Sequence, residues 1–114
     1  MNNYADSLGN QQRYAEAASL LRKTAPVARR VLGESHELAL KMRWTCARAL
    51  YFNPDATLDD LREAESMLKE VARIARRVLG GAHPLTLAFE QDLQNARADL
   101  RAALDARETP PRSA

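Results

Sequence analysis

Apolar residues recur every three or four positions over several long stretches of the chain. Steps of three and four place side chains on one face of a helix. Helices with one apolar face each, joined by short loops, bury those faces by stacking antiparallel against one another. The pattern is clearest in two stretches, Leu61, Ala64, Leu68, Val71, Ala75, Val78 and Leu79, and Leu85, Phe89, Leu93, Ala96, Leu100 and Leu104.

Turn-forming residues divide this pattern into five predicted helices. Gly33 suits the position after a helix end, where only glycine adopts the left-handed conformation cheaply, and Ser35 suits the N-cap of the next helix. Pro54 breaks the chain, whereas Pro84 fits the first turn of a helix. We therefore predict one all-α domain over 1–107, with a disordered tail over 108–114. Its helices are expected at 2–8, 12–32, 36–52, 58–79 and 84–107.

One proline departs from this scheme. Pro26 lies inside the predicted helix 12–32 and cannot donate a hydrogen bond to the Arg22 carbonyl. A proline at such a position kinks a helix at a cost of about 3 kcal/mol. We predict a bend there, which could be a tolerated adjustment to a neighbouring helix or a functional hinge.

The chain also contains an internal repeat. Residues 29–40 match residues 76–87 at an offset of 47, and the same offset aligns Glu16-Ala17 with Glu63-Ala64. A weaker match aligns residues 4–8 with residues 46–50 at an offset of 42. The difference of five residues is explained by a longer loop over 51–60, so the underlying period is about 42 residues, which is typical of helical repeat arrays.

The repeated residues resemble a known family, the tetratricopeptide repeat, in the variety found in kinesin light chains. That resemblance implies a short right-handed superhelix of antiparallel helix pairs, in which small residues such as Ala47 and Ala64 let helices approach closely. It also implies a non-enzymatic scaffold that binds proteins or peptides. The resemblance is carried by Asn2-Asn3-Tyr4-Ala5, Tyr14-Ala15-Glu16-Ala17, Leu32-Gly33-Glu34-Ser35-His36, Leu61-Arg62-Glu63-Ala64 and Leu79-Gly80-Gly81-Ala82-His83-Pro84.

The last predicted helix departs from the repeat pattern. Gln94 stands where the pattern has a small residue, and Arg97 stands where it has a large apolar one. Terminal repeats need a polar outer face for solubility. We expect the helix over 84–107 to be such a cap.

Charge and cysteine content narrow the functional classes. The formal net charge is +2, from 17 basic and 15 acidic residues, so a nucleic-acid partner is not expected. Arg29-Arg30 and Arg76-Arg77 suit the negative ends of two helix dipoles, although a basic strip for an acidic partner or RNA is an alternative. With Cys46 as the single cysteine, no internal disulfide can form. No apolar run is long enough for a membrane span and no signal peptide is evident, so we expect a cytoplasmic protein.

Catalytic chemistry finds no support in the sequence. Motifs of phosphate loops, nucleophile elbows and zinc proteases are all missing. His36 and His83 occupy equivalent positions at helix starts, where we expect structural roles, and Cys46 falls on a core position. We expect no catalytic residue, no metal site and no cofactor, and therefore no enzyme.

The resemblance implies a ligand surface on the concave side of the array, which is lined by the first helix of each pair. Trp44 is the leading candidate, since tryptophan is enriched at binding hot spots, although it could instead cover the edge of the core. Around it the resemblance places Lys41, Thr45 and Arg48 on the same helix, Asn3 on the first predicted helix and Gln91 on the last.

Three functions therefore stay open. The first is binding of a protein or peptide partner on the concave face. The second is a self-associating structural module, a homodimer for example, or a fragment of a longer array, because repeat arrays generally need three repeats for stability and this chain has about two. The third is weak binding of nucleic acid.

Overall fold

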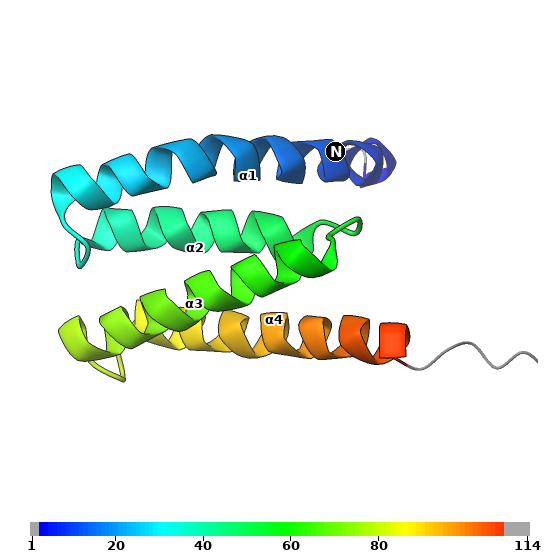
Figure 1. The fold of residues 1–114 in the computed structure, drawn as a ribbon. Coiled ribbons are helices and arrows are strands. Elements are labelled where there is room, and N and C mark those ends of the chain that lie inside the picture. Colours follow the sequence, from blue (N-terminus) through cyan, green and yellow to red (C-terminus); the bar gives the residue numbers. More distant parts are fainter. Residues whose placement is uncertain (1–2, 109–114) are drawn as a thin grey trace, which may run out of the picture.

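Four helices stack in chain order in the computed structural model, which describes the backbone over residues 3–108 and side chains over residues 13–106. They are α1 (Asn3–Leu32), α2 (Glu37–Phe52), α3 (Leu58–Val78) and α4 (Pro84–Glu108). Figure 1 shows consecutive helices running antiparallel, with α1 at one edge and α4 at the other. α2 contacts α1, α3 and α4, and α3 also packs on α4. The predicted all-α stack of antiparallel helix pairs is confirmed.

The first two predicted helices, 2–8 and 12–32, are one continuous helix in the structure. α1 runs from Asn3 to Leu32 through Gly9, where we had expected a turn. A single glycine costs a helix only about 1 kcal/mol. No proline stands near Gly9, since the first one after it is Pro26. The junction between residues 52 and 58 differs. There Pro54 disfavours helical geometry at Asn53, so the chain forms two separate helices, α2 and α3, and not one.

Pro26 does not end α1, since the helix continues on both sides of it. The bend that we predicted there stays a prediction. At the other end of the chain, α4 extends through Glu108, one residue beyond the predicted boundary and into the predicted tail. The rest of that tail, residues 109–114, lies outside the described residues.

Local chemistry explains the remaining helix ends. Gly33 and Gly80 have positive φ angles of 104° and 96°, as expected for residues that end helices. His36, rather than the predicted Ser35, is the N-cap of α2, because its Nδ1 accepts a hydrogen bond from the Leu38 amide. A histidine ring can reach over the first turn here and so replaces the serine hydroxyl. His83 accepts from the Leu85 amide in the same way, which confirms a structural role for both histidines.

α3 begins with a capping box. Thr57 Oγ1 accepts from the Asp60 amide at 3.1 Å, and the Asp60 carboxylate accepts from the Thr57 amide at 3.1 Å. This arrangement satisfies two backbone donors that a helix start leaves without partners. The capping box therefore sets where α3 begins.

Small and branched side chains dominate the core. The two alanines predicted to allow close helix approach, Ala47 and Ala64, are both fully buried. Cys46 is buried as expected and has no disulfide partner. Gln94 and Arg97 lie on the exposed side of α4, as expected for a polar outer helix. The other fully buried residues are Ala39, Leu40, Leu68, Val71, Ile74, Ala75, Thr86, Phe89 and Ala96.

The Gly33 turn yields a test of the fold. A Cβ at this position meets no atom within 4 Å, so the substitution Gly33→Ala adds backbone strain without a steric clash. We expect it to lower the free energy of unfolding by about 1–2 kcal/mol, the cost of a left-handed residue that carries a side chain. Urea unfolding followed by circular dichroism measures the change. Glu34→Ala, in the same exposed loop, is the control and should leave stability nearly unaltered.

Candidate functional site

Four of the six predicted ligand residues lie on α2 and one, Gln91, lies on α4. Lys41 and Thr45 are exposed one helical turn apart. The Lys41 ammonium lies 3.4 Å from the Glu37 carboxylate, and Thr45 Oγ1 donates to the Lys41 carbonyl at 2.9 Å. Gln91 is exposed on α4 and donates to Asn95 at 3.2 Å. The side chain of Asn3, the sixth predicted residue, lies outside those described.

Trp44 joins α2 to α4. Its ring meets the Phe89 ring edge-on at a centroid distance of 5.3 Å, and its indole N–H donates to the Asp92 carboxylate. The residue is half-buried. Trp44 therefore packs over the edge of the core while one side of its ring system stays at the surface.

Asp92 is the polar centre of this region, a role that the sequence analysis missed. Besides Trp44, it accepts a hydrogen bond from the Tyr51 hydroxyl at 2.6 Å, and the Arg48 guanidinium lies 3.6 Å away. Burial, reinforced by the hydrogen bond to Asp92, raises the pKa of Tyr51. The spacing held a signal, since Asp92 stands three residues after Phe89 and four before Ala96, both buried. Its position on the apolar face could have identified it as a buried anchor.

Arg48 covers two aromatic rings at the surface. Its guanidinium carbon lies 5.1 Å from the Trp44 ring centroid and 4.8 Å from that of Phe52. Such cation–π contacts orient an arginine at the protein surface. The structure thus brings Lys41, Trp44, Thr45 and Arg48 together on α2, as predicted, with Gln91 on the neighbouring helix.

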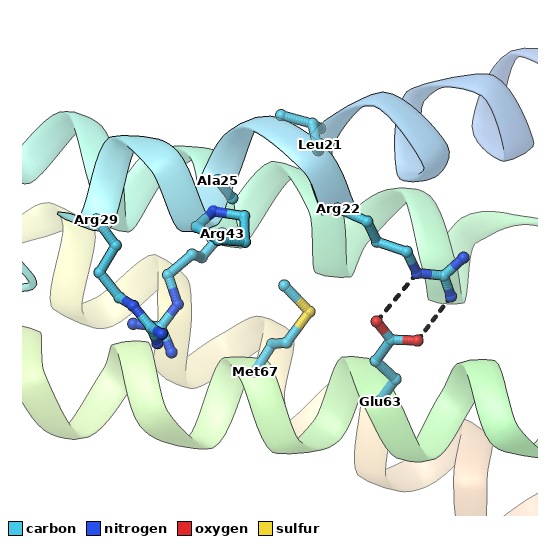
Figure 2. A pocket seen from close by; sticks show the side chains of 8 residues that line it. Leu21, Arg22, Ala25, Arg29, Arg43, Glu63 and Met67 are labelled. Atoms are coloured by element: carbon cyan, nitrogen blue, oxygen red, sulfur yellow. Dashed lines mark hydrogen bonds and ion pairs between the residues drawn. The ribbon is translucent and has the colours of Figure 1, made fainter. Parts of the chain in front are cut away.

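A hollow of about 220 Å³ lies between α1 and α3, and Arg43 of α2 contributes to its lining (Figure 2). Arg22 closes one end by donating two hydrogen bonds to Glu63, at 2.6 and 3.1 Å. At the other end Figure 2 shows the guanidinium groups of Arg29 and Arg43 side by side. This hollow could not be predicted from the sequence, because its residues come from three helices and share no motif.

Two like charges can gather there because Glu70 lies between them. Arg43 is almost completely buried and donates to the Glu70 carboxylate, while the Arg29 guanidinium lies 3.9 Å from the same group. The hydrogen bond from Arg43 holds the pKa of Glu70 below its usual value, despite the opposing effect of partial burial. A buried guanidinium is costly without a carboxylate partner. Glu70 therefore fastens α2 to α3 through Arg43.

The arginine pairs at the two helix ends are partly engaged within the protein. Arg76 donates to Glu90 at 2.8 Å and Arg29 approaches Glu70, whereas Arg30 and Arg77 are exposed. Because phosphate contacts supply most nucleic-acid affinity, internal acid partners reduce what these pairs can offer. The arrangement gives no specific support to nucleic-acid binding.

The described residues form neither a metal-binding cluster nor a membrane-spanning helix. Residues 13–106 contain no group of three or more histidine, cysteine, aspartate or glutamate side chains that could hold a metal ion. None of the four helices, as described, is long and apolar enough to cross a membrane.

The Asp92 contacts generate a prediction. Asp92→Ala removes the acceptor shared by Trp44 and Tyr51 and leaves two donors unpaired. Each buried unsatisfied polar group costs about 1–3 kcal/mol, so we expect a loss of about 2–4 kcal/mol in the free energy of unfolding. The emission spectrum of Trp44, the single tryptophan, should also change. Asp99→Ala is the control, because Asp99 is an exposed carboxylate on the same helix. It should alter neither the stability nor the spectrum.

The Arg43–Glu70 pair makes the stability dependent on pH. A carboxylate with a lowered folded-state pKa stabilises the fold above the unfolded pKa of about 4.3, and this contribution disappears as the pH falls through the folded pKa. We expect a double-mutant cycle of Arg43→Met and Glu70→Gln to give a favourable coupling energy near neutral pH. That coupling should vanish in strong acid. A coupling of equal size under both conditions would show that the two residues interact through packing alone.

Comparison with known proteins identifies the repeat. A model of the tetratricopeptide repeat matches residues 1–37 and 56–85, more than half of the 114 residues. The first segment takes in α1 and the turn that follows it, and the second takes in α3 and the turn that follows it, so the matches coincide with the two copies of the internal repeat. No curated protein and no solved structure matches the chain. The family match and the four-helix stack agree, and the chain belongs to the tetratricopeptide repeat family.

Proposed function

We propose that this chain is a non-enzymatic scaffold that binds a protein or peptide segment along α2 and α4. Tetratricopeptide repeats generally mediate protein–protein interactions, and scaffolds of this family are typically non-catalytic. The observation that carries the proposal is a cluster on α2 in which the half-buried Arg48 and Trp44 stack beside the exposed Lys41 and Thr45. Gln91 extends this surface onto α4.

The chemistry of this surface suits a peptide better than a small molecule. It is a shallow face that offers an ammonium group, a hydroxyl, an amide and the edge of an aromatic ring. Aromatic and arginine side chains contribute most of the energy at protein interfaces. The carboxylate of Asp92 is already engaged by its three neighbours, and the Thr45 hydroxyl donates to the Lys41 carbonyl, so the positive charges of Lys41 and Arg48 dominate what this surface offers a ligand. A segment with carboxylates or backbone carbonyls as acceptors is the complement.

We also propose that the repeats are of the kinesin-light-chain-like variety and that the protein works in the cytoplasm. The matching leucine–glycine–x–x–histidine turns at 32–36 and 79–83 support the variety. A single buried thiol without a disulfide partner is compatible with a reducing compartment. No cofactor, metal or nucleic acid forms part of this proposal.

The test is a selection of binding peptides from a displayed random library, using the full chain as bait. Peptides selected on the wild type should bind the double variant Lys41→Glu/Thr45→Glu at least about tenfold more weakly, because one new carboxylate replaces a donor and both repel acidic groups. Circular dichroism checks that the variant keeps its helicity.

A matched control places the same charge change elsewhere. Arg62→Glu/Ser66→Glu sets two glutamates one turn apart on exposed positions of α3, away from the proposed surface. It should bind the selected peptides as the wild type does. Equal binding by all three proteins would rule out the α2–α4 surface as the ligand site.

A further inference from the structure

A groove between α1 and α2 is open to solvent and is occupied by none of the four described helices. It encloses about 370 Å³ and its surface is mostly apolar. The Tyr14 and Phe52 rings meet across it at 6.3 Å, and Phe52 remains 40% exposed. The groove is lined by Arg13, Tyr14 and Ala17 from α1 and by Thr45, Arg48, Ala49 and Phe52 from α2.

The internal repeat shows what fills such a groove. At the offset of 47, Tyr14 and Ala17 of α1 correspond to Leu61 and Ala64 of α3, and Thr45 of α2 corresponds to Asp92 of α4. In the second copy Leu61, Ala64 and Asp92 are all buried, whereas Tyr14 and Ala17 are half-buried and Thr45 is exposed.

α2 accounts for that difference. It packs against both α3 and α4, and its Tyr51 and Trp44 donate to Asp92. The groove between α3 and α4 is therefore filled by a helix, whereas no helix within the described residues occupies the equivalent groove between α1 and α2.

The chain carries a sequence that matches the filling helix. Residues 4–8 align with residues 46–50 of α2 at the offset of 42, so that Ala5 and Leu8 correspond to Ala47 and Leu50. Both of these α2 residues are buried where α2 fills its groove. Residues 3–8 thus have the pattern needed to fill the open groove.

These residues cannot reach the groove of their own chain while α1 is straight. α1 is continuous from Asn3 to Leu32. At a rise of 1.5 Å per residue, residue 5 stands about 18 Å along the helix axis from Ala17. A second chain can supply the segment instead.

Charge also favours this segment as the occupant of the open groove. Asp92 of α4 is buried against α2, which brings Arg48 to within 3.6 Å of its carboxylate. The open groove is lined by Arg13 and Arg48, and the segment has Asp6 at the position that corresponds to Arg48 of α2. An acidic side chain of the segment would therefore enter a groove lined by two arginines.

We propose that two copies of this chain exchange their amino-terminal segments, with residues 3–8 of each lying in the α1–α2 groove of the other. Exchange of an identical element between protomers is a low-cost route to a dimer, because it reuses contacts for which the fold is already suited. The groove shares Thr45 and Arg48 with the proposed ligand surface, whereas Lys41 and Gln91 lie outside it. The two experiments below measure the association of chains and not peptide binding, so each proposal can fail without the other.

The first experiment measures molar mass by light scattering over a range of concentrations. The wild type should approach the mass of two chains. Asn10→Pro should break α1 after the segment, as Pro54 does between α2 and α3, and so let residues 3–8 fold back into their own groove. This variant should be a monomer of wild-type helicity, while Asn10→Ala, which keeps the helix, should stay dimeric. A wild type with the mass of one chain at every concentration, or an Asn10→Pro dimer, would overturn the proposal.

The second experiment captures the exchanged segment. Two chains are mixed, one with Asp6→Cys and one with Thr45→Cys, both with Cys46→Ala to remove the native thiol. Position 6 corresponds to Arg48 and position 45 corresponds to Asp92, and the Arg48 and Asp92 side chains lie 3.6 Å apart. Position 6 of one chain should therefore lie close to position 45 of the other, and a short bis-maleimide should link the two chain types. A double variant, Asp6→Cys/Thr45→Cys in one chain, tests the alternative that the segment stays within its own chain. If this variant is linked only within single chains, or if the mixed chains are not linked at all, the proposal is overturned.

Discussion

Burial of α2 against the three other helices is the constraint on which the rest of the structure depends. Ala47 lies at the centre of this packing, and its small side chain lets neighbouring backbones come close. Polar contacts then orient α2, since Arg43 is held by Glu70 of α3 and Trp44 and Tyr51 are held by Asp92 of α4. A core with so many alanines gains little area per residue, so these buried polar anchors add specificity to the stack.

The sequence predicts the helices well where the chemistry is local. Glycine at positions 33 and 80, threonine at 57 and proline at 84 each act within one turn, and the helix ends follow from them. The junction near Gly9 depends on a balance, because one glycine only weakly opposes a helix that the residues on both sides favour. The predicted helices 2–8 and 12–32 left a break there, but the proline that breaks the second copy has no counterpart in the first.

The candidate surface could be predicted in position but not in detail. Helical spacing is enough to place Lys41, Trp44, Thr45 and Arg48 together, since they share one side of a single helix. The role of Asp92 depends on where α4 crosses α2, and that crossing is set by packing between residues far apart in the chain. The same holds for the hollow of Arg29, Arg43 and Glu63, whose members come from three different helices.

The buried thiol of Cys46 has a consequence for the dynamics of the stack. Its Sγ lies 3.9 Å from the Ala18 carbonyl of α1, and burial raises its pKa, so thiol reagents cannot reach a reactive thiolate in the closed stack. Reaction requires α1 to separate from α2. The rate at which the thiol is modified in native conditions therefore measures the free energy of that local opening. The single cysteine of the chain acts as an intrinsic reporter of how often the first repeat detaches from the second.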